Sequence, residues 1–174
     1  MKNKKLFNLV LSAWFLALCM VLPFLTGQIK GIIHLPIMLC GLICGWKYGI
    51  IIGVIAPLLR SVVFGFPVIF PNAFAMSFEL ATYGFVVGYL FSHARVKSVK
   101  SLYISLLLAM ACGRAIWGIV YVCILGIGDN GFTWQIFITN GFINTLPSII
   151  LQLILIPVIM TTLGKNHIVE FSES

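Results

Sequence analysis

The chain has 174 residues, of which 61% are hydrophobic and only 9% are charged. A soluble domain is about 45–50% apolar and about 25% charged, so these numbers argue against a soluble enzyme, a nucleic-acid binder and a disordered tail. The net charge of +7 does not change this, because most of the eleven Lys and Arg residues flank apolar runs and form no single patch. We therefore predict an integral membrane protein whose main solvent is lipid.

The apolar runs are continuous and long, which predicts an all-α fold. A bilayer core about 30 Å thick requires about 20 apolar residues per helix, whereas a membrane barrel would alternate apolar and polar residues. The run after the N-terminal lysines is too long for a usual signal peptide, so we expect a retained first helix. Cutting the chain at charges, glycines and prolines predicts one membrane domain, residues 1–174, with six transmembrane helices at about 6–26, 31–45, 48–65, 72–92, 101–126 and 136–163. The second segment is short, and Pro57 interrupts the third.

The basic residues indicate how the spans are oriented. Six spans place both termini on one side of the membrane, and the cytoplasmic side carries the excess of Lys and Arg. The opposite side has only Lys30, while Arg60 and Arg114 lie within spans. The side of the termini holds Lys2, Lys4, Lys5, Lys47, Arg95, Lys97, Lys100 and Lys165. We therefore predict that both termini are cytoplasmic.

Three charged residues lie inside the predicted spans: Arg60, Glu79 and Arg114. Such residues are costly in a membrane and usually face a cavity or a partner. The helical rise places Arg60 and Glu79 within roughly 10 Å of the outer surface and Arg114 roughly 18 Å deep. One alternative is that Glu79 pairs with one arginine to hold the bundle together. The other base then stays unpaired, which favours an anionic or hydrogen-bonding ligand, although a backbone carbonyl would also satisfy it.

Uncharged polar and aromatic residues gather in the same outer half. His34 starts the second span near the outer face, and Trp134 lies in an outer loop. Helical spacing forms three stripes: Asn72, Met76, Glu79 and Tyr83; Arg114, Trp117 and Tyr121; Asn140, Asn144 and Ser148. We predict that these stripes, with His34 and Trp134, line a pocket open to the outside. The asparagines could instead be interhelical contacts.

The sequence lacks the motifs of an enzyme or a metal centre. It contains no Walker A sequence, H-E-x-x-H or G-x-S-x-G, so we expect no catalytic residue, metal or cofactor. The five cysteines are odd in number and lack zinc-site spacing, so we predict small buried residues in reduced form. Small-residue pairs occur four apart at Ala13/Ala17, Gly41/Gly45, Gly49/Gly53 and Gly84/Gly88. They predict close helix packing or, on the charge-free first span, docking of a partner membrane protein.

The chain resembles the substrate-binding S components of energy-coupling factor (ECF) transporters, which take up vitamins in bacteria. The residues that carry the resemblance are the Lys-rich start with Ala13 and Ala17, then 34–41 (HLPIMLCG), 45–49 (GWKYG), 56–61 (APLLRS) and 78–84 (FELATYG). The resemblance implies six helices in the bacterial cell membrane and one small molecule bound near the outer face. It also implies a transmembrane scaffold subunit that contacts Ala13 and Ala17, and two cytoplasmic ATPases. ATP hydrolysis in these partners would topple the loaded subunit and release substrate inward.

The identity of the substrate stays open at this point. Two arginines suit a carboxylate or phosphate, Glu79 suits an amine or ring N–H, and Trp117, Tyr121 and Trp134 suit a flat ring. A pyridoxine-type vitamin is our first expectation, followed by pantothenate or a queuosine-type precursor. The alternative function is a solitary proton-coupled carrier or channel that uses Glu79.

Overall fold

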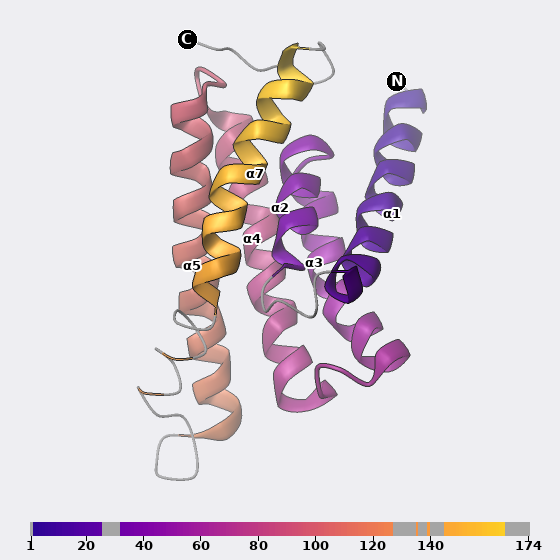
Figure 1. Cartoon of the computed structure of the whole chain (residues 1–174), viewed down its shortest axis with the longest axis vertical. Helices are drawn as coiled ribbons and strands as arrows, with labels where there is room; N and C mark the ends of the chain where they lie inside the picture. The colour runs from indigo at the N-terminus through magenta and orange to yellow at the C-terminus, as the bar shows by residue number, and fades with distance from the viewer. Residues whose placement is uncertain (1, 26–31, 127–134, 136–138, 140–144, 166–174) are drawn as a thin grey trace.

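The computed structural model describes residues 2–25, 32–126, 135, 139 and 145–165, and these residues contain helices but no strand. Figure 1 shows an up-and-down bundle in which consecutive helices run in alternating directions. The helices are α1 (Lys2–Leu25), α2 (His34–Ile43), α3 (Trp46–Phe64), α4 (Phe74–His93), α5 (Val99–Leu125) and α7 (Leu146–Lys165), with a short irregular turn, η1 (Ile69–Ala73), before α4. The all-helical prediction is therefore confirmed for the described residues.

Five of these helices are long and apolar enough to cross a membrane, which supports a multi-pass membrane protein. The exception is α2, whose ten residues extend only about 15 Å. The predicted span at 31–45 is thus shorter in the structure than the sequence indicates. By contrast, α3 continues through Pro57. Proline has no N–H group, so it removes the one hydrogen bond to the carbonyl four residues earlier. The remainder of α3 stays helical.

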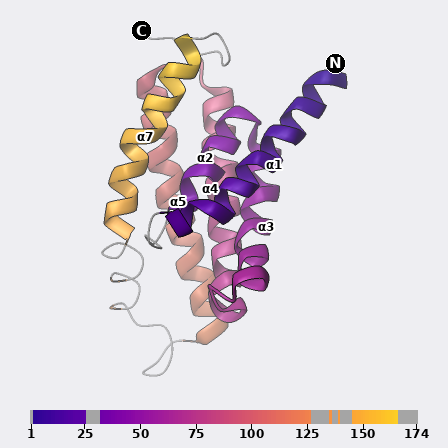
Figure 2. The same cartoon turned by 45° about the vertical axis from the view of Figure 1, so that its right-hand side comes forward.

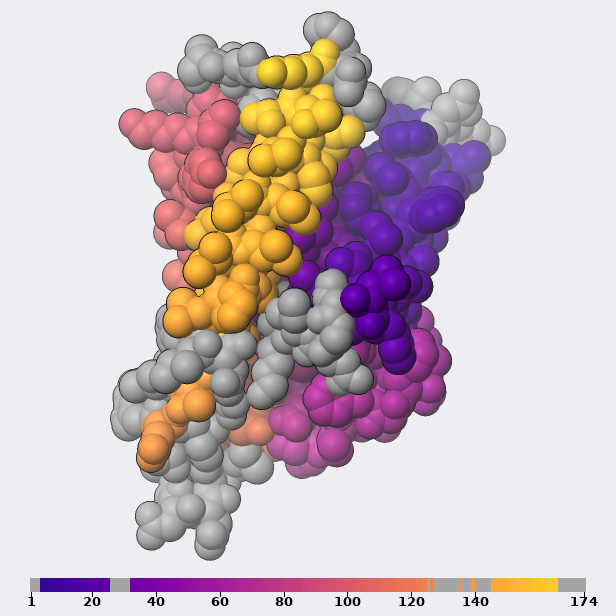
Figure 3. Space-filling model, in the orientation of Figure 1, coloured from indigo at the N-terminus to yellow at the C-terminus, as the bar shows by residue number. Residues whose placement is uncertain are grey.

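The most buried long helix is α4, which lies at the centre of the bundle. It packs against α3 and α5 along most of its length and also contacts α2. The first helix, α1, packs on α2 and α3, while α7 contacts α5 and α2 (Figures 1 and 2). In the space-filling view α7 crosses one face of the bundle and α1 flanks it (Figure 3). Residues on α4 are therefore the ones most shielded from lipid.

Glycines allow α2, α3 and α4 to approach at backbone distance. A Cβ atom on Gly84 of α4 would lie 2.5 Å from the backbone of Gly49 on α3, and one on Gly41 of α2 would lie 2.5 Å from the Gly84 carbonyl oxygen. A Cβ on Gly53 would meet the backbone of Leu80 at 2.6 Å. No larger residue fits these contacts, so the predicted close packing is confirmed for the glycines of spans two to four. Gly45 is the exception: it precedes α3 with a φ of 100°, and nothing lies within 4 Å of its Cβ position.

The outer surface of the bundle is apolar, as lipid contact requires. Large hydrophobic side chains such as Trp14, Val62 and Ile154 are exposed along the helices. Cys19, Cys40 and Cys44 are buried, but the prediction that all five cysteines are buried is wrong for Cys112 and Cys123. Both lie on α5. A thiol is apolar enough to face hydrocarbon, so burial in protein is not required there.

Apart from Arg60 and Arg114 within the helices, the Lys and Arg side chains of the described residues gather at one end of the bundle. The start of α1 and the end of α7 lie at the same end, together with the connection between α4 and α5 (Figure 1). This end carries Lys4, Lys5, Arg95, Lys100 and Lys165. The asymmetry matches the basic-residue pattern of the sequence, and the cytoplasmic orientation of this end stays a prediction.

Candidate functional site

A buried ion pair joins the two helices at the centre of the bundle. Arg114 Nη1 of α5 lies 2.8 Å from Glu79 Oε1 of α4, and the two residues are only 7% and 2% exposed. The predicted stripes of spans four and five therefore face each other. The sequence placed Arg114 about 8 Å deeper than Glu79. The two side chains still meet, because the arginine side chain is long and flexible and because the position of α5 along α4 brings Arg114 close to the level of Glu79.

Tyr83 gives the same carboxylate a second donor. Its hydroxyl donates to Glu79 Oε1 at 2.7 Å from one turn further along α4. The Tyr83 ring packs directly on the backbone of α5 at Gly113, where a Cβ atom would overlap the ring. Because two donors converge on one oxygen, Glu79 is held in a single orientation between α4 and α5.

His34 extends this cluster from a third helix. Its ring packs edge-on against Tyr83, with ring centroids 5.0 Å apart. The prediction that His34 lies near the outer face is wrong, because Tyr83 is halfway along α4 and the short α2 begins inside the bundle (Figure 1). His34 is buried, and no described residue forms a hydrogen bond with its ring. We call Glu79, Arg114, Tyr83 and His34 the central cluster.

A second layer lies nearer the α3–α4 connection. The Tyr121 hydroxyl of α5 donates to Asn72 Oδ1 at 2.8 Å. The rings of Trp117 and Tyr121 pack in a tilted arrangement, with centroids 4.9 Å apart and planes at 32°. Asn72 belongs to η1 and precedes α4, so this layer ties the irregular turn to α5. The structure thus brings together the predicted residues Asn72, Trp117 and Tyr121. Along α5, Trp117 lies about one turn and Tyr121 about two turns from Arg114 of the ion pair.

Arg60 stands apart from the ion pair. It lies in the last turns of α3 and is 8% exposed, near the Cys19 thiol of α1. Its buried Nε has no hydrogen-bond partner, and no described residue forms an ion pair with its guanidinium. Within the part of the chain that the structure describes, Arg114 is thus the partner of Glu79 and Arg60 forms no ion pair, as expected for one of the two arginines. The structure does not join all three charges in one contact.

The remaining predicted pocket residues, Trp134, Asn140 and Asn144, lie outside the described residues. Sequence reasoning missed Gln152 on α7, which is 1% exposed. Its Nε2 donates to Ser148 Oγ at 2.7 Å. The sequence did contain a signal for it: Gln152 is a single amide inside an apolar run, and it lies four residues after Ser148, on the same face of the helix. A polar position on α7 therefore faces the interior as well.

The predicted docking residues Ala13 and Ala17 lie on the exposed side of α1. The opposite side of the helix, with Ser12, Phe15 and Cys19, is buried against the bundle. Among the long helices α1 is also the least buried. The described contacts of the chain itself therefore leave the Ala13–Ala17 surface open.

Residues 7–160 match the family described as ECF transporter, substrate-specific component. The chain belongs to this family. No curated protein and no solved structure was found to match it. Membership makes the S component a membrane transport protein and implies a small-molecule substrate, a scaffold and ATPase components as its partners. In this context the central cluster is a set of buried polar groups within the helices of a substrate-binding subunit, and the layer around Tyr121 is partly buried.

Proposed function

We propose that this S component captures a vitamin or related micronutrient in a pocket that opens to the outside of a bacterial cell membrane. The observation that carries the proposal is the family match over residues 7–160, together with buried polar groups that line facing surfaces of α4 and α5. Polar groups inside a membrane protein are costly unless they serve a partner or ligand. A substrate site is the function that accounts for both.

The unpaired donor of Arg60 indicates what the substrate would supply. The Arg60 Nε is buried without a partner, and a buried unpaired donor costs free energy that an acceptor on a ligand would recover. Trp117 and Tyr121 place two neighbouring aromatic rings on one side of α5, which suits packing against a flat heteroaromatic ring. These features support a ring-containing substrate with an acidic or strongly accepting substituent. A pyridoxine-type vitamin is the first candidate, with pantothenate or a queuosine-type precursor next.

The energy for uptake comes from partners in this proposal. The S component itself needs no cofactor, and ATP is used by two cytoplasmic ATPase subunits. The exposed Ala13 and Ala17 form a small-residue surface against which a scaffold helix can pack closely. Hydrolysis in the partners then topples the loaded subunit in the membrane and releases the substrate to the cytoplasm.

The test begins with the purified protein in detergent or nanodiscs. Mass spectrometry of the bound small molecule and titration with pyridoxine, pantothenate and a deazaguanine should reveal one tight ligand. A separate ATPase assay of the S component alone should show no activity. Arg60→Gln should weaken binding about tenfold or more, as expected for loss of a charged hydrogen bond. Lys47→Gln, at the far end of α3, is the matched control and should bind as the wild type does. Substrate movement driven by a proton gradient in liposomes that hold the S component alone would contradict the proposal and favour a carrier that uses Glu79.

A further inference from the structure

A groove of about 370 Å³ lies at the basic end of the bundle, between the end of α4 and the start of α5. It is separate from the central cluster: the lining residues Leu90 and Leu108 lie seven residues from Tyr83 and six from Arg114, about 10 Å and 9 Å along their helices. The proposed uptake mechanism makes no use of it. Its lining comes entirely from residues 90–108.

The groove is polar at one end and apolar at the other. The polar end has two cations, Arg95 and Lys100, and the hydroxyl groups of Ser98 and Ser101. Leu90, Ile104 and Leu108 form the apolar end. Lys100 and Leu108 are eight residues apart on α5, which is about 12 Å along the helix. The change in polarity therefore follows the direction from headgroup to hydrocarbon in a bilayer leaflet.

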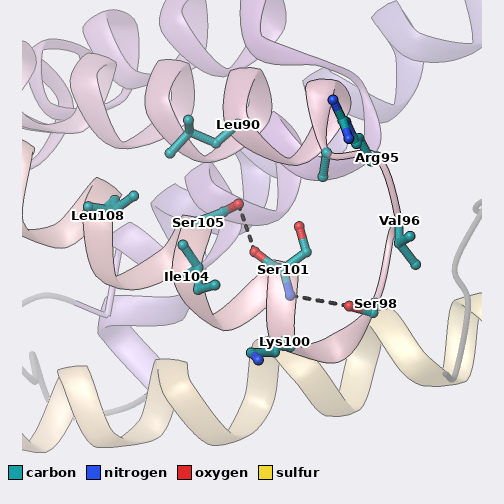
Figure 4. A pocket seen from close by; sticks show the side chains of 10 residues that line it. Leu90, Arg95, Val96, Ser98, Lys100, Ser101, Ile104, Ser105 and Leu108 are labelled. Atoms are coloured by element: carbon teal, nitrogen blue, oxygen red, sulfur yellow. Dashed lines mark hydrogen bonds between the residues drawn. The ribbon is translucent and has the colours of Figure 1, made fainter.

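The charged groups of the groove are available to a ligand. Arg95 and Lys100 are exposed, neither forms an ion pair with a described residue, and none of the ten lining residues is acidic. The Ser105 hydroxyl donates to the Ser101 carbonyl at 2.9 Å, and Ser98 Oγ caps α5 by accepting from the Ser101 amide at 3.4 Å (Figure 4). The Ser101 hydroxyl itself forms no bond to a described residue, so it is free to donate to an anion.

We infer that this groove binds one anionic phospholipid, with its phosphate at Arg95 and Lys100 and the start of an acyl chain along Ile104 and Leu108. Basic pockets at the cytoplasmic boundary bind anionic headgroups through their cations. A free phosphate would use only the polar end and leave the exposed side chains of Ile104 and Leu108 without a partner. The polarity of the whole groove therefore favours a lipid.

Native mass spectrometry of the full-length protein from micelles doped with phosphatidylglycerol or phosphatidylcholine tests the inference. The wild type should retain phosphatidylglycerol preferentially. R95Q/K100Q should lower that retention on the order of tenfold, while K4Q/K5Q, with the same loss of charge at the start of α1 on the other side of the bundle (Figure 1), should change it less than twofold. Ile104→Trp, at a side chain that is 51% exposed, should block the groove and lower retention without changing charge.

Three results would overturn the inference. The first is equal retention of the two lipids by the wild type, or equal loss in the two charge variants. The second is protection of the protein against heat by inorganic phosphate to the same extent as by phosphatidylglycerol, which would show an anion site without a lipid. The third is unchanged lipid retention in R95Q/K100Q together with lost binding of the scaffold subunit, which would show a protein interface.

Discussion

Removing Glu79 alone from the Glu79–Arg114 pair should destabilise the bundle more than removing both charges. Glu79→Gln leaves the Arg114 guanidinium, only 7% exposed, without its counter-ion. The free energy of unfolding should fall by about 3 kcal/mol. This value is at the low end for loss of one partner of a buried ion pair, and it is similar to the cost of placing an arginine at the centre of a membrane helix. Arg114→Met should cost less, about 2 kcal/mol, because the Tyr83 hydroxyl at 2.7 Å still donates to the carboxylate.

The double variant separates the pair from its surroundings. Glu79→Gln with Arg114→Met leaves no charge, and the new amide oxygen can still accept from the Tyr83 hydroxyl, so we expect a cost of about 2 kcal/mol and a coupling energy of about 3 kcal/mol. The free energy of unfolding of the wild type, both single variants and the double variant is measured in mixed micelles by tryptophan fluorescence. A coupling energy below about 0.5 kcal/mol would show that the 2.8 Å contact does not stabilise the protein, and would refute the reasoning.

The same variants report on the pocket. If Arg114 contacts an anion or acceptor of the substrate, Arg114→Met should weaken binding by more than about 2 kcal/mol, measured by titration on the folded fraction. Retained affinity in a destabilised but folded variant would assign Arg114 a structural role alone.

Three further predictions concern other contacts of the chain. Gly84→Ala places a Cβ atom 2.5 Å from the Gly49 backbone and should destabilise the protein by about 1–3 kcal/mol; an unchanged thermal midpoint would mean that α3 and α4 separate easily. Tyr121→Phe removes the hydrogen bond to Asn72 and should cost about 1 kcal/mol in unfolding, with the cost absent in an Asn72→Ala background if the bond is the cause. Ala13→Trp, on the exposed side of α1, should leave substrate affinity intact but prevent co-purification with the scaffold and uptake in cells; normal uptake would place the docking surface elsewhere.

The helical content and the facing of α4 and α5 could be predicted because lipid imposes strong rules. A chain in hydrocarbon must satisfy its backbone internally, so long apolar runs form helices. An ion pair between Glu79 and one of the two intramembrane arginines could be proposed because unpaired charges are costly in a membrane, although the sequence left open which arginine it was. Tyr83 and Tyr121 followed from their helical spacing. These inferences depend only on the helical repeat and on the free-energy cost of placing a charged side chain in a membrane.

The length of α2 and the position of His34 could not be predicted in the same way. Apolar composition at 31–45 shows that the segment can lie in a membrane, and it contains no signal for where the helix begins. Gln152 was missed because its burial depends on which face α7 turns inward. Cys112 and Cys123 were assigned to the interior because a thiol is apolar, although lipid accepts an apolar side chain equally well.

By itself the sequence determined the class of the protein, its apolar segments and the charge asymmetry between its two ends, because these depend on composition and on the helical repeat. Only the tertiary structure decided that Arg114 pairs with Glu79 while Arg60 stays apart, that His34 meets Tyr83 at mid-bundle, and that α4 occupies the centre. These outcomes depend on the register and rotation of helices packed through glycine contacts. A shift of one residue rotates a side chain by about 100°, and nothing in a single helix specifies that rotation.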